Sequence, residues 1–316
     1  MNYRRLGDAG IKVSEVALGS WLTFGASVDE EVTRECVKVA VENGVNFLDS
    51  ADAYASGEAE RVLGEVIKDL GLRRQHLVIS SKAYWPMSDD VNDRGLSRKH
   101  LMESVEGSLE RLGTDYLDLF FCHRYDPNVE LEEVVRALDD LVRQGKVLYW
   151  GTSVWTAAQI EAAVGIARNY VAYPPQMEQP RYNMLDRHIE PEIMPLCARH
   201  GMGLTVFSPL AQGILTGKYN DGIPEGSRAD ESDWLSGDLT EDKLEKVRRL
   251  TGIAQDLGIT MAQLALAWVL RRPEISTVIT GATNPDHVRE NVQAAEVELS
   301  DDVLAEIEGI LDNAPE

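Results

Sequence analysis

The residues of this chain best suited to acid and base chemistry follow three successive apolar segments; they are Asp49, Tyr54, Lys82 and His123. A phenol has a pKa of about 10, but a neighbouring ammonium group favours the phenolate and lowers that pKa. Lys82 can act on Tyr54 in this way, and Asp49 can supply the countercharge that a buried ammonium needs. A histidine beside the phenol can hold a carbonyl oxygen or relay a proton. Together, these residue types predict a site that protonates a carbonyl oxygen while negative charge develops on it.

Each of these residues also has a structural interpretation. Asp49 and Lys82 could cap or pair locally, Tyr54 could pack with its hydroxyl satisfied, and His123 could be a hydrogen-bonded core residue. Their occurrence at three successive segment ends favours the functional interpretation over several independent structural ones.

The segments that position these residues alternate between short β-type runs and longer helix-type runs, which is typical of βαβ units with a parallel sheet. Apolar residues at helical spacing, such as Val32, Cys36 and Val39, mark the helix-type runs. The expected strands cover residues 16–19, 46–49, 77–80, 115–121, 147–152, 176–178, 204–207 and 276–279. The expected helices cover residues 29–43, 58–70, 97–112, 131–144, 156–168, 187–200, 241–257, 259–270 and 301–311, with one more opening near residue 285. Residues 217–240 are expected to form a long surface loop.

Eight strand and helix pairs in a chain of this length predict an α/β fold, a (β/α)8 TIM barrel. The competing architecture is a doubly wound open sheet, which carries the motif G-x-G-x-x-G after its first strand when it binds a dinucleotide. Residues 19–25 lack that spacing. Residues 3–6 and 12–15 flank a short turn and predict an N-terminal β-hairpin. Because no linker-like stretch divides the chain, we expect one domain over residues 1–316, with extra helices towards the C-terminus.

The composition, with 44% hydrophobic and 27% charged residues in 316, is typical of a globular protein. Lys and Arg number 31 against 53 Asp and Glu, and the formal net charge of −22 disfavours nucleic acids and anionic membranes as partners. No apolar run approaches the roughly 18 residues of a membrane span, and residues 1–8 lack the apolar core of a secretory signal. We therefore expect a cytoplasmic protein without membrane insertion. The spread of acidic residues and the scarcity of lysine suggest either a salt-rich cytoplasm or a compositional bias of the genome.

The chain has an odd number of cysteines without metal-ligand spacing; they are Cys36, Cys122 and Cys197. This pattern predicts neither a disulfide framework nor a metal site. We expect the thiols to be reduced and mostly buried.

Beyond these patterns, the chain resembles the aldo-keto reductases, and most of all the branch that includes the β subunits of voltage-gated potassium channels. The motifs that carry the resemblance lie, in this order, at residues 47–54, 95–100, 149–153, 207–213 and 281–284. The resemblance runs nearly from end to end. It implies a (β/α)8 barrel with a hairpin across its N-terminal mouth, and an NADPH-dependent enzyme that interconverts carbonyl and CH–OH groups with NADP+ as the acceptor.

The resemblance also assigns roles to the four residues. Tyr54 would be the proton donor, Lys82 and Asp49 would tune it, and His123 would orient the substrate carbonyl. Hydride would pass from C4 of the nicotinamide to the carbonyl carbon.

The cofactor contacts implied by the resemblance fall into three groups. At the nicotinamide they are Ser153, Gln179 and Phe207, the last in place of the aromatic residue that usually packs near the ring; Ser20, Trp21 and Asp49 are further expected cofactor contacts. Along the pyrophosphate they are Ser208, Pro209, Leu210, Ala211 and Gly213, with Lys218 and Arg228 closing over the phosphates from the long loop. At the adenosine end they are Gly281, Thr283, His287, Glu290 and Asn291.

Two positions depart from the family pattern. His287 stands where Gln or Arg is expected, and because a neutral histidine gives no fixed positive charge, use of NADH in place of NADPH stays open. Val154 replaces an arginine of the channel-subunit branch. The bound substrate is expected to be a small carbonyl compound, and an aromatic pocket would suit small or aromatic aldehydes; its expected residues are Trp21, Tyr54, Trp85, His123 and Tyr125.

Two other functions compete with the reductase. The first is a cofactor-binding redox-sensing or interaction subunit like a channel β subunit, but those subunits carry asparagine where this chain has His123. The second is a metal-dependent barrel hydrolase, which the absence of an H-x-H ligand cluster disfavours. Since the channel-subunit branch forms tetramers, a homo-oligomer also stays open.

Overall fold

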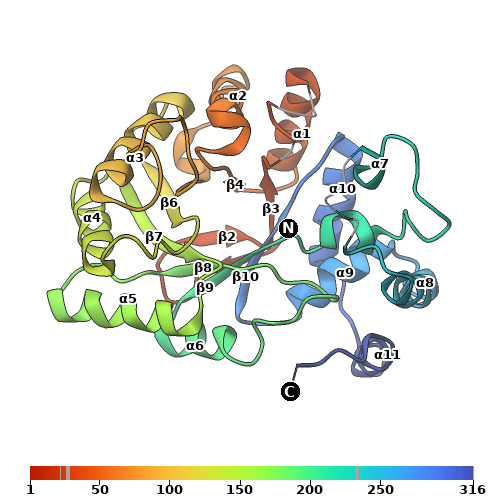
Figure 1. Cartoon of the computed structure of the whole chain (residues 1–316). Helices are drawn as coiled ribbons and strands as arrows, with labels where there is room; N and C mark the ends of the chain where they lie inside the picture. The colour runs from red at the N-terminus through yellow and green to blue at the C-terminus, as the bar shows by residue number, and fades with distance from the viewer. Residues whose placement is uncertain (22, 26–28, 232–234, 236, 316) are drawn as a thin grey trace.

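The computed structural model describes residues 1–21, 23–25, 29–231, 235 and 237–315, and of Arg228 and Glu231 it describes only the backbone. Eight parallel strands close into a barrel that helices surround (Figure 1). The strands are β3 (Val16–Gly19), β4 (Phe47–Asp49), β5 (Val78–Ala83), β6 (Leu117–Cys122), β7 (Val147–Ser153), β8 (Met177–Gln179), β9 (Gly203–Phe207) and β10 (Ile275–Thr280). They follow chain order around the barrel, and β10 pairs with both β9 and β3. The predicted TIM barrel is therefore confirmed.

The helices lie outside the strands. They are α1 (Glu30–Glu42), α2 (Glu58–Asp69), α3 (Arg98–Leu112), α4 (Leu131–Arg143), α5 (Ala157–Tyr170), α6 (Ile193–His200), α7 (Arg228–Glu231), α8 (Glu241–Asp256), α9 (Met261–Leu270), α10 (Pro285–Gln293) and α11 (Asp301–Leu311). Several begin at side-chain caps. Ser97 accepts a hydrogen bond from His100 N, and Thr156 and Thr260 form reciprocal capping boxes with glutamines three residues on.

One helix differs clearly from its predicted range. The sequence predicted a helix over residues 187–200, but α6 begins at Ile193. Pro191 disfavours the helical conformation of Glu190 before it. The side chains of Arg187 and Glu190 instead pair at 2.9 Å, and Glu190 also accepts a hydrogen bond from Tyr182 at 2.6 Å. The predicted loop over residues 217–240 contains the short helix α7.

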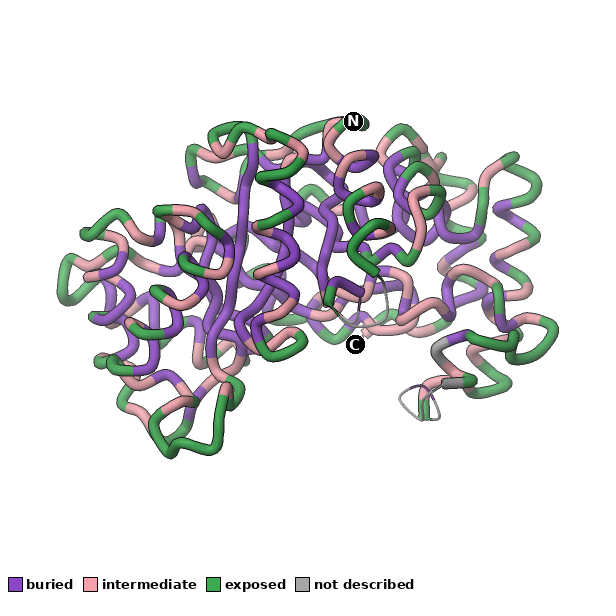
Figure 2. The backbone as a smooth tube through the Cα atoms, turned by 90° about the horizontal axis from the view of Figure 1, so that it is seen from above, coloured by how far each residue is buried: buried purple, intermediate pink, exposed green. Residues whose placement is uncertain are grey.

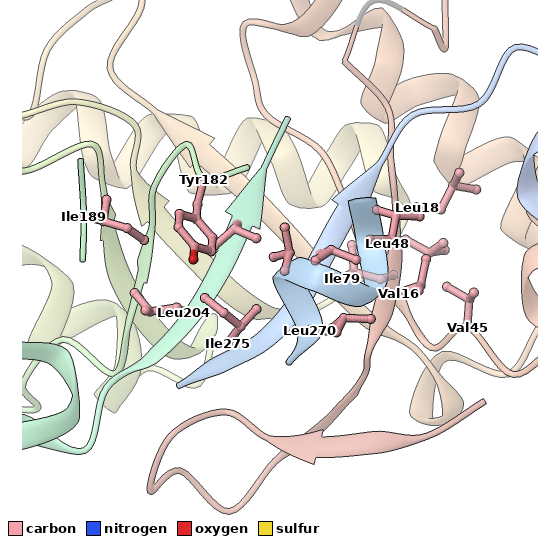
Figure 3. Packing of buried hydrophobic residues seen from close by; sticks show 14 of the residues in the cluster. Val16, Leu18, Val45, Leu48, Ile79, Tyr182, Ile189, Leu204, Leu270 and Ile275 are labelled. Carbon is pink, nitrogen blue, oxygen red and sulfur yellow. The ribbon is translucent and has the colours of Figure 1, made fainter. Parts of the chain in front are cut away.

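Apolar side chains fill two regions of the barrel. A large cluster packs the strands against the helices, and Figure 3 shows Leu18, Leu48 and Ile79 from three neighbouring strands among its members. A smaller cluster fills the inside of the barrel and includes Phe47 and Val78. In the view of Figure 2 the buried residues occupy the middle of the molecule and the exposed residues lie mostly around it.

A hairpin of β1 (Tyr3–Arg5) and β2 (Lys12–Ser14) closes the N-terminal end of the barrel. Its buried side chains Leu6, Ala9 and Val13 belong to the cluster inside the barrel. The hairpin is held at the start of β9, where Asp8 N donates a hydrogen bond to Gly201 O at 2.8 Å. The interior is therefore apolar at this end, and polar side chains are left for the opposite mouth.

The cysteines Cys36, Cys122 and Cys197 are buried and unpaired, as predicted. Burial, with a smaller effect of Glu35, raises the pKa of Cys36 to about 11, and burial likewise raises the pKa of Cys122 and Cys197. All three are therefore neutral thiols at physiological pH.

Among the described residues, no single helix is long and apolar enough to cross a membrane, and α8 and α9 reach that length and composition only as a pair bent by 92°. The described residues also contain no group of three His, Cys, Asp or Glu side chains that could hold a metal ion.

Candidate active site

Three of the expected site residues lie at the C-terminal ends of neighbouring strands. Asp49 ends β4, Lys82 is the last but one residue of β5, and His123 directly follows β6. Because side chains alternate between the two faces of a strand, Asp49 lies on the same face as Phe47 and Lys82 on the same face as Val78. Phe47 and Val78 point into the barrel. Asp49 and Lys82 therefore lie inside the barrel, at its open mouth.

Tyr54 begins a short 3-10 helix, η1 (Tyr54–Gly57), soon after β4. The next three residues, Ala55, Ser56 and Gly57, have φ angles of 48°, 54° and 91°. Such left-handed conformations cost a non-glycine residue about 1–3 kcal/mol and concentrate at functional sites. This strained turn holds Tyr54 beside Lys82, whose Nζ lies 4.9 Å from the centre of the phenol ring.

Lys82 and Asp49 form a buried ion pair whose polar atoms are well satisfied. Lys82 Nζ lies 2.7 Å from Asp49 Oδ2 and donates a second hydrogen bond to Ser50 O at 2.7 Å. The other carboxylate oxygen, Asp49 Oδ1, accepts from Ser80 Oγ at 2.7 Å and from Gln179 Nε2 at 3.1 Å. Burial alone lowers the pKa of Lys82, but the adjacent carboxylate reverses this and raises that pKa above its ordinary value. Lys82 is therefore positively charged.

Tyr54 is held in its protonated form. Burial raises the pKa of Tyr54 above its ordinary value, and the Lys82 ammonium offsets this only in part. The sequence predicted that Lys82 lowers this pKa, and Lys82 does act in that direction, but desolvation of the phenolate outweighs its effect. A phenol that keeps its proton at neutral pH is the state that a proton donor requires.

His123 lies against Tyr54, with ring centroids 5.7 Å apart and the rings edge to face at 75°. The histidine is buried, and burial, together with the positive charges of Lys82 and Arg124, holds its pKa well below the ordinary range. Its Nδ1 is buried and has no hydrogen-bond partner among the described residues. At neutral pH the site therefore contains an uncharged imidazole whose hydrogen-bonding capacity is not used up.

The expected aromatic pocket is formed in part. Trp85 lies 6.2 Å from His123, measured between ring centroids, and is 41% exposed. Trp21 follows β3 and is half-buried. Tyr125 instead packs edge-on against the buried Trp155 at 5.0 Å. The structure thus brings Trp85, His123 and Tyr54 together, while Tyr125 belongs to a neighbouring contact.

Several residues expected to contact the cofactor belong to the same hydrogen-bond network. Ser20 Oγ and Ser50 Oγ lie 2.9 Å apart, and Ser153 Oγ donates to Gln179 O at 2.9 Å. Since the side chain of Gln179 reaches Asp49, hydrogen bonds link the ends of β4, β7 and β8.

The segment after β9 has unusual backbone geometry. Phe207 ends the strand, and Pro209 and Leu210 follow within the turn. Left-handed φ angles occur at Ser208 (50°), Ala211 (46°), Gln212 (57°) and Gly213 (102°). Asn183 Nδ2 supports this turn through Ser208 O at 3.0 Å, and Gln212 Oε1 is buried without a partner among the described residues. Lys218 is exposed, while the side chain of Arg228 lies outside what the structure describes.

The residues expected at the adenosine end surround the start of α10. Asn284 caps this helix by accepting from His287 N at 3.0 Å. The His287 ring lies 3.4 Å from Thr283 Oγ1 and 3.2 Å from Asn284 Nδ2. Gly281 and Thr283 are exposed just after β10, Glu290 is half-buried and Asn291 is buried.

Sequence reasoning missed Glu178 on β8. Its carboxyl group is fully buried, accepts from the Thr152 hydroxyl, and lies 3.4 Å from Trp155 N. Burial raises the pKa of Glu178 to about 7, although these hydrogen bonds and the N–H of Val154 oppose the rise. Val154 itself has φ 57°, which is strained for a β-branched residue. Glu178 therefore fixes the turn that follows Ser153, and its only sequence signal is an acidic residue inside an expected strand.

Sequence reasoning also missed Arg124, which directly follows His123 and lies half-buried at the mouth. A basic residue after an apolar strand is by itself a weak signal, because most such residues face solvent.

A model of the aldo/keto reductase family matches residues 15–312 of the chain. The chain therefore belongs to the aldo/keto reductase family, a family of oxidoreductases whose members generally bind NAD(P)H. It is 44% identical over its full length to an Arabidopsis thaliana protein named "Probable voltage-gated potassium channel subunit beta", of which 98% is covered. A protein of the same name from Oryza sativa subsp. japonica is 42% identical, again over the full chain and 98% of the relative. The resemblance to the channel-subunit branch is thus confirmed.

Proposed function

We propose that this protein is an NADP(H)-dependent oxidoreductase that reduces aldehydes or ketones to alcohols, with Tyr54 as the proton donor. The observation that carries the proposal is the contact of a protonated Tyr54 with the charged Lys82, which Asp49 neutralises at 2.7 Å. An uncharged His123 beside the phenol completes the set.

The residues at the mouth fit a nicotinamide dinucleotide. Gln212 Oε1 is buried without a partner in the part of the chain that the structure describes, and left-handed φ angles recur after β9; both are features of a segment shaped around a ligand. Ser153, Gln179 and Phe207 would lie at the nicotinamide end. The pyrophosphate would be held by Ser208, Pro209, Leu210, Ala211 and Gly213, with Lys218 and Arg228, and the adenosine end by Gly281, Thr283, His287, Glu290 and Asn291. When bound, this cofactor supplies the hydride for the carbonyl carbon.

The chain's own residues then handle the proton. Tyr54 donates its hydroxyl proton to the carbonyl oxygen as negative charge develops there. The Lys82 ammonium stabilises the phenolate that remains, and Asp49 keeps that ammonium in place. A neutral imidazole N–H of His123 donates a hydrogen bond to the same oxygen and orients the substrate. The neutral state of His123 suits this role because a third positive charge beside Lys82 and Arg124 is costly to bury.

Because Trp85 lies against the His123 ring and Trp21 follows the C-terminal end of β3, we propose small or aromatic carbonyl compounds as substrates. The unpaired thiols fit the reducing environment of a cytoplasm, where we place the reaction.

The test compares the native protein with Tyr54→Phe. Oxidation of NADPH and, separately, of NADH is followed with a panel of aldehydes and ketones, and cofactor binding is measured by fluorescence for both proteins. We expect Tyr54→Phe to lower kcat by about 10²- to 10⁴-fold, the range for loss of a general acid, with cofactor affinity retained. Turnover that survives unchanged in Tyr54→Phe would exclude Tyr54 as the donor.

The names of the relatives favour one other candidate, a cofactor-binding subunit that associates with a potassium channel. The same assay separates the two functions. If NADPH binds tightly and the native protein reduces none of the carbonyl compounds, the subunit function is favoured, and co-purification with a channel becomes the next measurement.

A further inference from the structure

Arg124 is fixed at the mouth of the barrel, beside the proposed substrate pocket. Its Nη1 donates a hydrogen bond to the carbonyl oxygen of His123, and its guanidinium carbon lies 5.6 Å from the centre of the Trp85 ring. Trp85 in turn contacts the His123 ring. The guanidinium is also close enough to act electrostatically on the Tyr54 hydroxyl. It therefore lies next to the groups proposed to act on the carbonyl.

Among the described residues, Arg124 differs from the other partly buried cations because no carboxylate is in ion-pair contact with it, although the buried Glu178 acts on it electrostatically from farther away. Every other buried or half-buried lysine or arginine whose side chain is described has a carboxylate in ion-pair contact. Arg74 pairs with Asp118 at 2.6 Å, for example, and Arg111 with Glu60 at 2.7 Å. Within the described part of the chain, no carboxylate pairs with Arg124 in this way.

The missing partner is not explained by a shortage of acidic residues, since the chain has 53 acidic against 31 basic ones. A partly desolvated cation without a countercharge in direct contact is costly. Burial accordingly lowers the pKa of Arg124, although it stays protonated because an arginine starts near 12.5. A guanidinium in this state offers a planar pair of donors that matches a carboxylate or phosphate group.

We propose that Arg124 binds an oxyanion group of the substrate, so that the preferred substrates are aldehydes or ketones that also carry a carboxylate or a phosphate. This inference rests on the proposed reductase function. The net charge of −22 repels such substrates at long range, and the guanidinium supplies the local attraction that lets them dock beside Trp85 with the carbonyl at Tyr54.

The test uses two substrates of similar shape, para-carboxybenzaldehyde and its neutral methyl ester. The measured quantity is the ratio of kcat/KM for the acid to kcat/KM for the ester. We expect Arg124→Gln to lower this ratio about tenfold or more, chiefly through KM for the acid, the order expected when an ion pair is lost in a partly desolvated site. Arg124→Lys should retain part of the preference. Arg94→Gln, an equal change of charge in the exposed loop after β5, should leave the ratio as in the native protein.

Three outcomes would overturn the inference. The ratio could be the same in Arg124→Gln as in the native protein, Arg94→Gln could lower it equally, or Arg124→Gln could weaken NADPH binding without changing the ratio, in which case the guanidinium serves the cofactor. If the native protein reduces neither substrate, the proposed function fails. Calorimetric titration with para-carboxybenzyl alcohol and its methyl ester then tests the anion preference of Arg124 without turnover.

Discussion

The Asp49 and Lys82 pair is buried, so replacing only one of the two residues leaves the charge of the other without its partner. Lys82→Met leaves the Asp49 carboxylate in the barrel without its cation, although Ser80 and Gln179 still donate to it. Because an unpaired buried charge is costly, we expect the free energy of unfolding to fall by about 3–5 kcal/mol. Urea denaturation measures this loss.

The double variant Asp49→Asn with Lys82→Met is the control for charge. It removes both charges, so we expect it to regain part of the stability that Lys82→Met loses while remaining inactive. Equal stabilities of the single and double variants would show that packing, and not the isolated carboxylate, sets the cost.

Glu178 makes the stability of the fold depend on pH. Its pKa is raised by burial from 4.5 to about 7, so the folded protein keeps this proton in a range where the unfolded chain has lost it. Stability from this group is complete below pH 4.5 and is lost as the pH rises through about 7. Glu178→Gln removes the ionisation, and its Oε1 and Nε2 can still bond Trp155 N and the Thr152 hydroxyl.

We therefore expect the unfolding free energy of Glu178→Gln to increase relative to that of the native protein as the pH rises. The difference in unfolding free energy should grow by on the order of 3 kcal/mol between pH 4.5 and pH 8, measured by urea denaturation across that range. The pKa of Asp52 is also raised to about 7 by burial. Asp52 makes the unfolding free energy of both proteins depend on pH in the same way, so its effect cancels in the difference. A difference that stays constant with pH would mean that Glu178 is ionised in the fold at all these values.

Side-chain types and strand ends were enough to find Asp49, Tyr54, Lys82 and His123, because the ends of successive parallel strands meet at one mouth. The same two signals did not identify Glu178 and Arg124. Whether an acid inside a strand is buried against a neighbouring turn depends on packing between β7 and β8, and whether an arginine lacks a partner depends on every acid around it. That burial outweighs the effect of Lys82 on the Tyr54 pKa could not be predicted either, since desolvation is a property of the assembled site.

The contact between α2 and α3 positions the turn that carries Tyr54, since α2 begins directly after it. Gly64 lies in this contact, where an added Cβ would be 2.7 Å from Leu112 O and 2.8 Å from Arg111 O. We expect Gly64→Ala to lower the unfolding free energy by about 1–3 kcal/mol, because the two helices must separate.

Gly165 provides the matched control. It lies in the interior of α5, with nothing within 4 Å of an added Cβ, so Gly165→Ala should raise stability by about 0.5–1 kcal/mol. Thermal unfolding of both variants checks the pair. If Gly64→Ala is also stabilising, the approach of the two helices is looser than described.

Element order and type were predictable because many helices have an amphipathic pattern and most begin at a Ser, Thr, Asp or Asn cap. The residues at which the elements begin and end were less predictable. The helix predicted from residue 187 starts at Ile193, since the ion pair of Arg187 with Glu190 and the position of Pro191 favour an irregular turn. The spacing of apolar residues, from which the helix was predicted, carries no information on the ion pair or on the proline.

The whole molecule has a net charge of −22, and like charges on one surface repel. Raising the salt concentration from about 0.01 to 0.15 M shortens the Debye length from about 30 to 8 Å and screens this repulsion. We expect Tm to rise over that range of KCl. Exposed ion pairs such as Lys99 with Glu103 weaken in salt, but each contributes little.

This range lies below the concentrations at which salts act through the hydrophobic effect, so calorimetric scans at a few KCl concentrations suffice. An unchanged or falling Tm would argue against adaptation to a salt-rich environment and leave a compositional bias as the explanation of the acidic surface.

The burial of Cys36, Cys122 and Cys197 makes the molecule convenient to label. Maleimide dyes react with thiolates, and three neutral, inaccessible thiols leave the native chain without a reactive position. A single cysteine at the exposed Ile223 would therefore take up one fluorophore in an otherwise unchanged protein. Such a probe would report how the segment between β9 and α8 responds when a dinucleotide is added, with no native cysteine to remove first.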